Sequence, residues 1–373
     1  MKLSIAKADL QRGLGRIQQI VERRNSMPIL ANVLLDARKG ERGALLIAAT
    51  DLEVGIRSEH EAQVGKPGAL TVSARKLYDV VRELPDETVS LGATANSYLE
   101  LQCGRARFSL AGASAEEYPS LPEFPSDRLV RLPAAVLSVM ITRVMYAASV
   151  DETRYNLNGA FVEVDAGAGK LRMVATDGHR LALVDRALGP DVEGLASGVI
   201  IPRKGLAEMK RLVDEEDDDE VEIGFAGNSG LVRRGGVTLV MRLIEGEFPD
   251  YRKVIPASFE QALVLPAEVL IAALRRVAVL SSERSRAVKL DLGDGRLVVS
   301  SNNPDLGEAQ EEVDVDYEGA KLTLGFNVRY LLDALGALAA KEVRLGLRDA
   351  NSPAQIQPTD DGESLAVVMP MRL

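Results

Sequence analysis

The sequence repeats one short pattern at intervals of 126 residues. An apolar run leads into a polar turn at Thr50, again at Thr176 and again at Asn302, so the pattern occurs three times in 373 residues. A polar turn between apolar runs is typical of the connection between neighbouring strands. We therefore expect one structural unit repeated three times, which agrees with the two or three domains that this length favours.

Each repeat also contains two amphipathic helices. The first is predicted from apolar residues three and four positions apart, which begin at Leu10, Leu137 and Leu270. The second is expected to follow Ser73, Pro202 and Asn327 in the three repeats, and short strand-like runs fill the intervals. The order predicts an α+β fold in which two helices of each domain pack on antiparallel β-sheets.

Two proline-rich stretches mark the joints between the repeats. They run over residues 118–125 and 248–256, where proline favours extended connectors. The predicted domains are therefore residues 1–126, 127–256 and 257–373.

Composition excludes several classes of protein. A single cysteine, Cys103, rules out an internal disulfide, and with two histidines a zinc site of the usual kind cannot be built. No apolar run reaches the 18 or so residues that cross a bilayer, and no signal peptide is expected. We expect a cytoplasmic protein without a metal or cofactor.

The charge is segregated along the chain. The net charge is −10, but seven acidic residues from Asp214 to Glu220 account for much of it and predict a solvated loop. Basic residues recur on the predicted helices, which indicates a surface for sequence-independent phosphate contact, although helix propensity alone is an alternative explanation. Aromatic residues are 4% and tryptophan is absent, which disfavours a groove that stacks single-stranded bases. The basic residues are Lys7, Arg12, Arg16, Arg75, Lys76, Arg82, Arg143, Arg203, Lys204, Lys210, Arg211, Arg275, Arg276 and Arg329.

The central turn could also carry catalysis. Asp177 and His179 are two residues apart and could form an acid–base pair. The equivalent turns contain Asp51 and Asn303 but no histidine, so a carboxylate that binds its own backbone is the simpler interpretation.

Six motifs lie in order along the chain, at residues 154–155 with 157–159, 175–181, 202–205, 248–251, 325–327 and 367–373. They resemble the bacterial DNA polymerase III beta subunit family, the replicative sliding clamps. The resemblance covers the whole chain in order and implies a DNA-clamp fold that closes into a six-domain ring as a head-to-tail homodimer around duplex DNA. It implies a non-catalytic processivity factor, with DNA contacts from Arg24, Arg75, Arg154, Tyr155, Arg203 and Lys204.

The resemblance also implies an apolar cleft between the second and third domains. The cleft would accept a short peptide with Gln and Leu/Phe anchors from the replicative polymerase α subunit, clamp-loader subunits, other polymerases and mismatch-repair proteins. Met and Leu give such a site an adaptable floor. The matching positions are Leu157, Thr176, Gly178, His179, Arg180, Leu181, Pro249, Val254, Asn327, Tyr330, Val367, Val368, Met369, Pro370, Met371 and Arg372. Since strand neighbours face opposite ways, one of Val367 and Val368 is expected to be a core residue.

The implied dimer interface joins the edges of the first and third domains. It would bring Arg105, Arg107, Phe108 and Leu110 against Val279, Leu280, Glu308, Glu311 and Glu312. Phe108 and Leu110 could instead fill their own core. The departures from the family pattern are Asn156 in place of a second tyrosine, Lys253 in place of arginine and Ser285 in place of a bulky apolar residue. A repeat scaffold that binds peptides without encircling DNA is the alternative function.

Overall fold

The computed structural model contains two compact units. One comprises Met1–Ala134 and Arg211–Leu243, and the other comprises Ala135–Lys210 and Ile244–Leu373. Each unit is described by itself. The structure describes residues 1–21, 27–39, 43–121, 124, 129–189, 195, 197–215, 219–282 and 285–372.

The first unit is built on one antiparallel sheet of 13 strands. The sheet runs in the order β10-β15-β16-β17-β4-β3-β2-β6-β9-β8-β7-β1-β5. The strands are β1 (Lys2–Ala6), β2 (Asn32–Arg38), β3 (Ala44–Thr50), β4 (Val54–Glu61), β5 (Gln63–Lys66), β6 (Gly68–Ser73), β7 (Thr88–Ala93), β8 (Tyr98–Cys103), β9 (Ala106–Ala113), β10 (Val130–Pro133), β15 (Glu220–Ala226), β16 (Ser229–Arg234) and β17 (Val237–Arg242).

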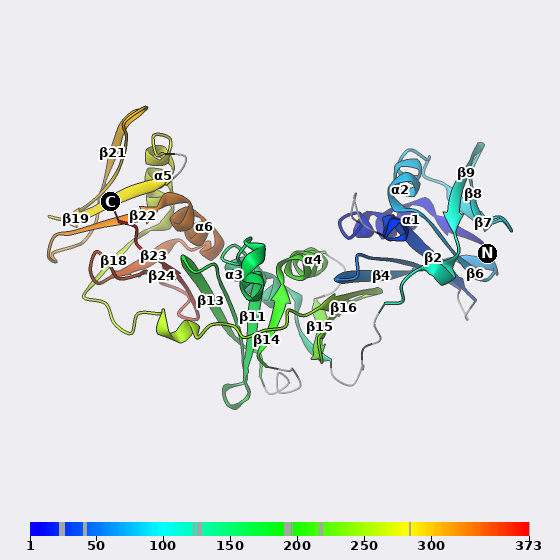
Figure 1. Cartoon of the computed structure of the whole chain (residues 1–373), viewed down its shortest axis with the longest axis horizontal. Coiled ribbons are helices and arrows are strands. Elements are labelled where there is room, and N and C mark those ends of the chain that lie inside the picture. Colours follow the sequence, from blue (N-terminus) through cyan, green and yellow to red (C-terminus); the bar gives the residue numbers. More distant parts are fainter. Residues whose placement is uncertain are drawn as a thin grey trace. The chain divides into compact units, whose positions relative to one another are not determined.

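Helices α1 (Lys7–Ile17) and α2 (Ala74–Arg82) lie side by side in this unit (Figure 1). The apolar face of α1, which includes Leu10 and Leu14, is fully buried, as the spacing predicts. Helix α2 begins after Ser73, whose hydroxyl accepts a hydrogen bond from the amide of Lys76 and caps the helix. The predicted helices therefore form where the sequence places both an apolar face and a start signal.

The second unit contains a sheet of eight strands and a sheet of four. Their orders are β14-β11-β12-β13-β25-β24-β23-β18 and β21-β20-β19-β22. The strands are β11 (Gly159–Asp165), β12 (Lys170–Thr176), β13 (Arg180–Ala187), β14 (Val199–Pro202), β18 (Gln261–Pro266), β19 (Ala287–Gly293), β20 (Arg296–Asn303), β21 (Gly307–Asp314), β22 (Leu322–Asn327), β23 (Glu342–Leu347), β24 (Ala354–Pro358) and β25 (Ser364–Val368).

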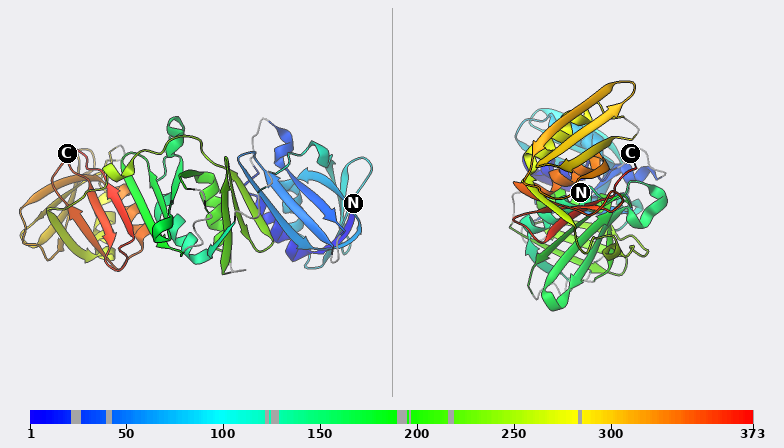
Figure 2. Two further views of the ribbon diagram at one scale, coloured as in Figure 1. Left: turned by 90° about the horizontal axis from the view of Figure 1, so that it is seen from below. Right: turned by 90° about the vertical axis from the view of Figure 1, so that its left-hand side faces the viewer.

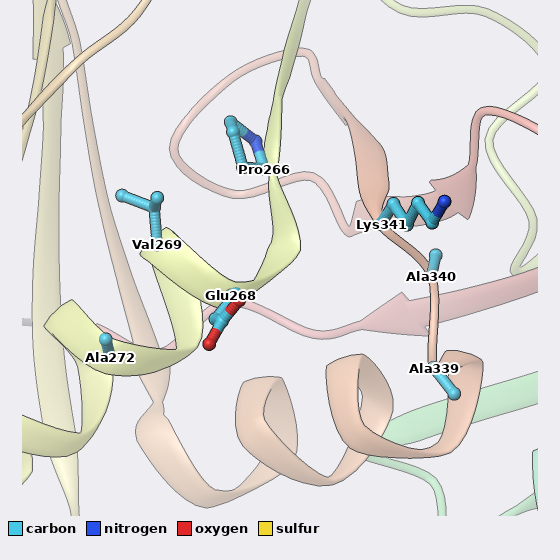
Figure 3. A pocket seen from close by; sticks show the side chains of 7 residues that line it. All are labelled: Pro266, Glu268, Val269, Ala272, Ala339, Ala340 and Lys341. Atoms are coloured by element: carbon cyan, nitrogen blue, oxygen red, sulfur yellow. The ribbon is translucent and has the colours of Figure 1, made fainter.

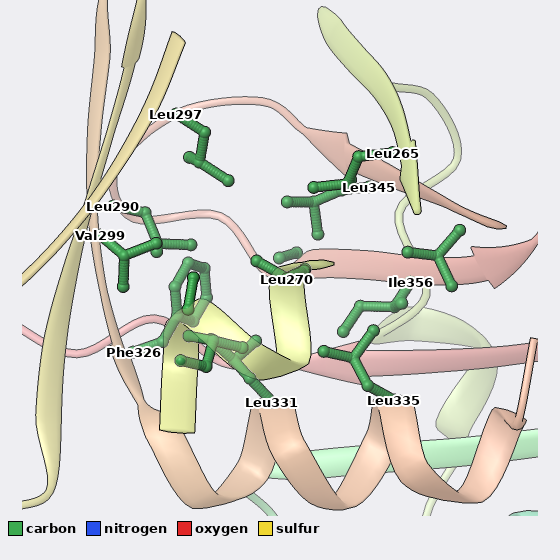
Figure 4. Packing of buried hydrophobic residues seen from close by; sticks show 14 of the residues in the cluster. Leu265, Leu270, Leu290, Leu297, Val299, Phe326, Leu331, Leu335, Leu345 and Ile356 are labelled. Carbon is green, nitrogen blue, oxygen red and sulfur yellow. The ribbon is translucent and has the colours of Figure 1, made fainter. Parts of the chain in front are cut away.

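The other four predicted helices are also present. They are α3 (Ala134–Met145), α4 (Arg203–Val213), α5 (Ala267–Ala278) and α6 (Val328–Leu338). Leu270 of α5 and the pair Leu331 and Leu335 of α6 pack with strand residues around Phe326, which is fully buried (Figure 4). Burying one such side chain stabilises the fold by about 1.5–3 kcal/mol, so this cluster alone gives the third repeat a core of its own.

Short 3₁₀ segments connect several of these elements. They are η1 (Pro28–Ala31), η2 (Ala115–Glu117), η4 (Glu152–Leu157), η5 (Ala166–Ala168) and η7 (Tyr251–Lys253). In the described part of the chain, no helix is long and apolar enough to span a membrane.

The middle repeat shares a sheet with each of the other repeats. Strand β17 pairs with β4 of the first repeat, and β13 pairs with β25 of the third (Figure 2). The two joints have the same register, because the amide of Arg242 donates to the carbonyl of Glu53 (2.7 Å) and the amide of Met369 donates to that of His179 (2.8 Å). Continuous backbone pairing therefore explains why the compact units do not coincide with the three repeats.

Candidate functional site

The turn between β12 and β13 is held by its own side chains. The hydroxyl of Thr176 donates to the carbonyl of Arg180 (2.6 Å) and accepts from the amide of Gly178 (3.1 Å). One carboxylate oxygen of Asp177 accepts from the amides of His179 (2.9 Å) and Arg180 (3.0 Å). The carboxylate is thus used by the turn, as the simpler interpretation expected, and not by an acid–base pair with the ring of His179.

The side chain of Arg180 is enclosed by aromatic rings and carboxylates. Its guanidinium lies 5.3 Å from the ring centre of Tyr146 and 4.7 Å from that of Tyr330, which favours cation–π attraction. It also forms ion pairs with Asp333 (2.6 Å) and Asp177 (3.0 Å). Burial alone would lower the pKa of Arg180, but the hydrogen bond to Asp333 and the charge of Asp177 raise this pKa above its ordinary value. The ring of His179 stacks on that of Tyr330, with the ring centroids 6.2 Å apart.

These side chains line a hollow of about 720 Å³ within the second unit. His179, Arg180, Asn327 and Tyr330 were predicted for the peptide cleft, and the structure brings them together. Tyr146 and Asp333 were missed, because no local pattern connects them with Arg180. Other lining residues are Ala148, Ser149, Val150, Asp151, Arg154, Asp177, Arg203, Arg286 and Arg329.

An apolar cluster adjoins the same turn. It contains Leu157, Leu181 and Val367 from the predicted cleft, together with Phe248 and Tyr251 of the connector. These residues are buried, so they form a floor beneath the surface rather than the surface itself.

The side chains of strand β25 alternate between the core of the third repeat and the floor of the predicted cleft. Val368 faces away from the apolar floor and is fully buried in the core of the third repeat, so we exclude it from the cleft. The reason is the alternation of side chains along a strand, which sends Val367 to the opposite face. Met369, Pro370 and Met371 are half-buried, while Arg372 is exposed. The connector contributes the exposed residues Pro249 and Val254.

Four of the predicted DNA-contact residues lie in the second unit. Arg154 and Arg203 both line the 720 Å³ hollow, and Tyr155 is 59% exposed. Lys204 follows Arg203 in the first turn of α4. Arg75 is exposed in the first turn of α2 in the other unit, and Arg24 lies outside the described residues.

Some of the basic helix residues do not belong to a free phosphate-binding face. Arg16 forms an ion pair with Glu215 (Nε–Oε1 3.0 Å), so part of the acidic run is a structural partner and not only a solvated loop. Arg143 is largely buried against Asp361, and Arg276 binds Glu311. The helical pattern shows which face is polar, but the partners from distant strands could not be predicted from it.

Strands β9 and β21 each leave an edge open along most of their length. Among the strands that the structure describes, β9 pairs with β8 and meets β6 at Gly112 and Ala113, while β21 pairs with β20. Arg105 and Arg107 are exposed at the first edge, where Phe108 is 38% exposed. Leu110 is half-buried. An open edge is a ready template for pairing with another chain.

The residues predicted to meet β9 lie at and near the β21 edge. Glu308 and Glu312 are exposed, and Glu311 is half-buried beside Arg276. Val279 is 74% exposed just after α5, and Leu280 is half-buried.

A smaller hollow of about 460 Å³ lies between the start of α5 and the end of α6 (Figure 3). Its lining consists mainly of small apolar side chains such as Ala272 and Ala339, with Glu268 and Lys341 at the rim. No predicted site residue is among its described lining. No group of three or more His, Cys, Asp and Glu side chains suited to a metal ion occurs in the described ranges.

Comparison with known proteins covers the whole chain. Models of the N-terminal, central and C-terminal domains of the DNA polymerase III beta subunit match residues 1–122, 131–250 and 252–372. The beta sliding clamp of Caulobacter vibrioides is 40% identical over 378 residues, with 100% of both chains covered. A crystal structure of the Caulobacter crescentus clamp has a TM-score of 0.94 at 39% identity, and one from Bartonella birtlesii bound to griselimycin has 0.95 at 37%. Both cover 100% of each chain.

Three α+β domains of this kind define the class of DNA-clamp proteins. The chain belongs to the DNA polymerase III beta subunit family, the beta sliding clamps of bacterial DNA replication. Members of this family are non-catalytic processivity factors of DNA polymerase III.

Proposed function

We propose that two copies of this chain close head to tail into a ring around duplex DNA and keep the replicative polymerase on its template. The observation that carries the proposal is the pair of open edges, β9 and β21. Arg105 and Arg107 supply positive charge at one edge, and Glu308 supplies negative charge at the other, where Glu312 already forms an ion pair with Arg296 (2.8 Å). Pairing the edges between copies would remove both exposed templates and fix the head-to-tail direction.

Within the ring, basic side chains would contact phosphates without reading sequence. The proposed contacts are Arg154 and Arg203, which line the hollow, together with Tyr155, Lys204, Arg75 and Arg24. A closed ring is retained by topology, so weak and salt-sensitive contacts are sufficient and allow sliding.

The proposed cleft lies where β13 meets β25. Its floor is the buried group Leu157, Leu181 and Val367, and the hollow beside His179 and Tyr330 extends it. The proposed occupants are short peptides with Gln and Leu/Phe anchors from the polymerase α subunit, clamp-loader subunits, other polymerases and mismatch-repair proteins. The working location is the cytoplasm, and the proposed domain boundaries are near residues 126 and 256. The remaining proposed cleft residues are Thr176, Gly178, Arg180, Pro249, Val254, Asn327, Met369, Pro370, Met371 and Arg372.

The test is retention on DNA circles of different topology. The loaded protein is placed on nicked circular DNA, and retention is measured before and after the circle is cut once. Loss only after cutting is expected, because a ring slides off a free end. Equal retention on both forms would mean ordinary electrostatic binding, and no retention on either would favour the peptide scaffold.

A further inference from the structure

The connector between the second and third repeats is held by side chains rather than by a strand ladder. From Glu245 to Pro256 it forms no strand, although it carries Pro249 and Val254 of the proposed cleft. The amide of Val254 donates to the carbonyl of Tyr251 (3.1 Å). A group that fixes Tyr251 therefore also fixes Val254.

The hydroxyl of Tyr251 ends a row of charged side chains. It donates to Glu163 Oε2 (2.6 Å) and accepts from Arg172 Nη1 (3.1 Å). The Nε and Nη2 atoms of Arg172 each lie 2.6 Å from the carboxylate of Asp185. Burial and the neighbouring Glu163 raise the pKa of Tyr251, so the phenol keeps the proton that it donates.

This row crosses three neighbouring strands. Glu163 of β11 lies opposite Arg172 of β12, which lies opposite Asp185 of β13. Side chains in directly opposed positions share one face of a sheet. The row therefore attaches the connector to the sheet whose strand β13 begins at the cleft.

An aromatic contact attaches the same segment to the same face of the sheet, because Phe161 lies two residues before Glu163 on β11. Phe248 stacks on Phe161 with centroids 5.0 Å apart, and the ring of Tyr251 lies 6.4 Å from Phe161. Phe248 and Tyr251 belong to the buried cluster that contains the cleft residues Leu181 and Val367. The ring packing alone would keep the connector near the sheet. The hydrogen bonds of the Tyr251 hydroxyl also fix where along the sheet the connector lies.

We propose that Tyr251 is a positioning residue for peptide binding. Its hydroxyl, held by Glu163 and Arg172, fixes the connector so that Pro249 and Val254 form a wall of the cleft before a peptide arrives. A wall that is already ordered lowers the entropic cost of binding. This inference rests on the proposed cleft.

The experiment measures binding of a short fluorescent peptide with a Gln and a Leu-Phe anchor to the full chain. Tyr251→Phe is expected to raise the Kd by about 5- to 10-fold, mainly through faster dissociation. The matched control is Tyr118→Phe, which removes a hydroxyl that accepts from the amide of Thr50 (3.1 Å) and donates to the carbonyl of Asn32 (3.2 Å). This control should leave the Kd unchanged. An unchanged Kd for Tyr251→Phe would overturn the inference.

A double-mutant cycle separates positioning from general loosening of the fold. In a Val254→Ala background, Tyr251→Phe is expected to change the Kd by less than about 2-fold, because its effect is exerted through the connector. An equal loss in both backgrounds would overturn the inference. Glu163→Gln, which keeps an acceptor oxygen, should retain more affinity than Glu163→Ala, and the reverse order would contradict the proposed hydrogen bond.

The wild-type chain distinguishes failure of this inference from failure of the proposed function. Binding of the peptide by the wild type, with an unchanged Kd in Tyr251→Phe, would remove only the positioning role. Absence of wild-type binding would remove the cleft, and the positioning role with it.

Discussion

Leu52 and Gly178 occupy the same position in two copies of one turn. Both have positive φ, 78° and 87°. In each copy the amide at this position donates to the hydroxyl of the threonine two residues earlier, at 3.0 and 3.1 Å. The threonine and aspartate side chains therefore impose the turn even where a leucine must adopt the left-handed conformation.

This strain predicts that Leu52→Gly stabilises the protein. The left-handed conformation costs a leucine about 1–2 kcal/mol, and glycine's extra entropy in the unfolded chain offsets about 0.5–1 kcal/mol of that gain. Because Leu52 is 53% exposed, little buried surface is lost. The free energy of unfolding of the first unit, measured in urea, should rise by about 0.5–1 kcal/mol.

The matched substitution in the other turn is Gly178→Ala. It should destabilise, because the added Cβ takes on the strained φ and would lie 3.0 Å from Arg154 Nη1. A lower midpoint for Leu52→Gly, or a higher one for Gly178→Ala, would contradict the strain argument.

Helix α1 predicts opposite effects for two alanine substitutions. A Cβ at Gly15 would lie 3.8 Å from Tyr78, an ordinary contact, so Gly15→Ala should stabilise by about 0.8–1 kcal/mol through helix propensity. A Cβ at Gly13 would lie 2.5 Å from the ring nitrogen of His60 and 2.6 Å from Ile47, so Gly13→Ala should destabilise despite the same propensity. Urea unfolding of both variants provides the measurement. Stabilisation by both would show that the helix can move away from the sheet.

His60 predicts a dependence of stability on pH. Its ring lies 2.9 Å from the hydroxyl of Ser58, and burial, with the nearby charge of Arg16, lowers its pKa to about 4. The unfolded chain then binds the proton more tightly than the folded chain. The free energy of unfolding therefore has its full value above pH 6.5, where His60 is neutral in both states. It falls by on the order of 2 kcal/mol as the pH is lowered towards 4.

The measurement compares unfolding of the wild type and His60→Gln from pH 7.5 to 4.5. The wild type should lose more stability than the variant within that window. Parallel pH profiles would mean that other groups cause the acid sensitivity.

Asp361 predicts the strength of the joint between the second and third repeats. Its carboxylate binds both Arg143 and Arg186, whose side chains are largely buried. Asp361→Asn would leave two neighbouring guanidinium groups without the carboxylate that pairs with both, and should destabilise the second unit by about 2–4 kcal/mol. Thermal unfolding measures the loss.

An exposed ion pair supplies the control for this prediction. Asp294 and Lys321 are each 76% exposed, so Asp294→Asn should leave the free energy of unfolding nearly unchanged. Equal effects of the two substitutions would mean that burial does not determine the strength of the Asp361 cluster.

The features that depend on near neighbours could be predicted from the amino-acid sequence. The three polar turns, the six amphipathic helices and the carboxylate of Asp177 bonded to its own backbone all follow from residues a few positions apart. The family motifs added the class of protein because they preserve such local patterns in order along the whole chain.

Which distant side chains meet could not be predicted from the sequence and was seen in the folded chain. Arg180 is enclosed by Tyr146 and Asp333, and Val368 is a core residue while Val367 faces the cleft floor. Arg143 lies on a predicted basic helix face, but its side chain forms an ion pair with Asp361. The physical reason is that helix and strand periodicity fixes only the face on which a side chain lies. The partner on that face is determined by strand pairing and helix packing, which bring distant parts of the chain together.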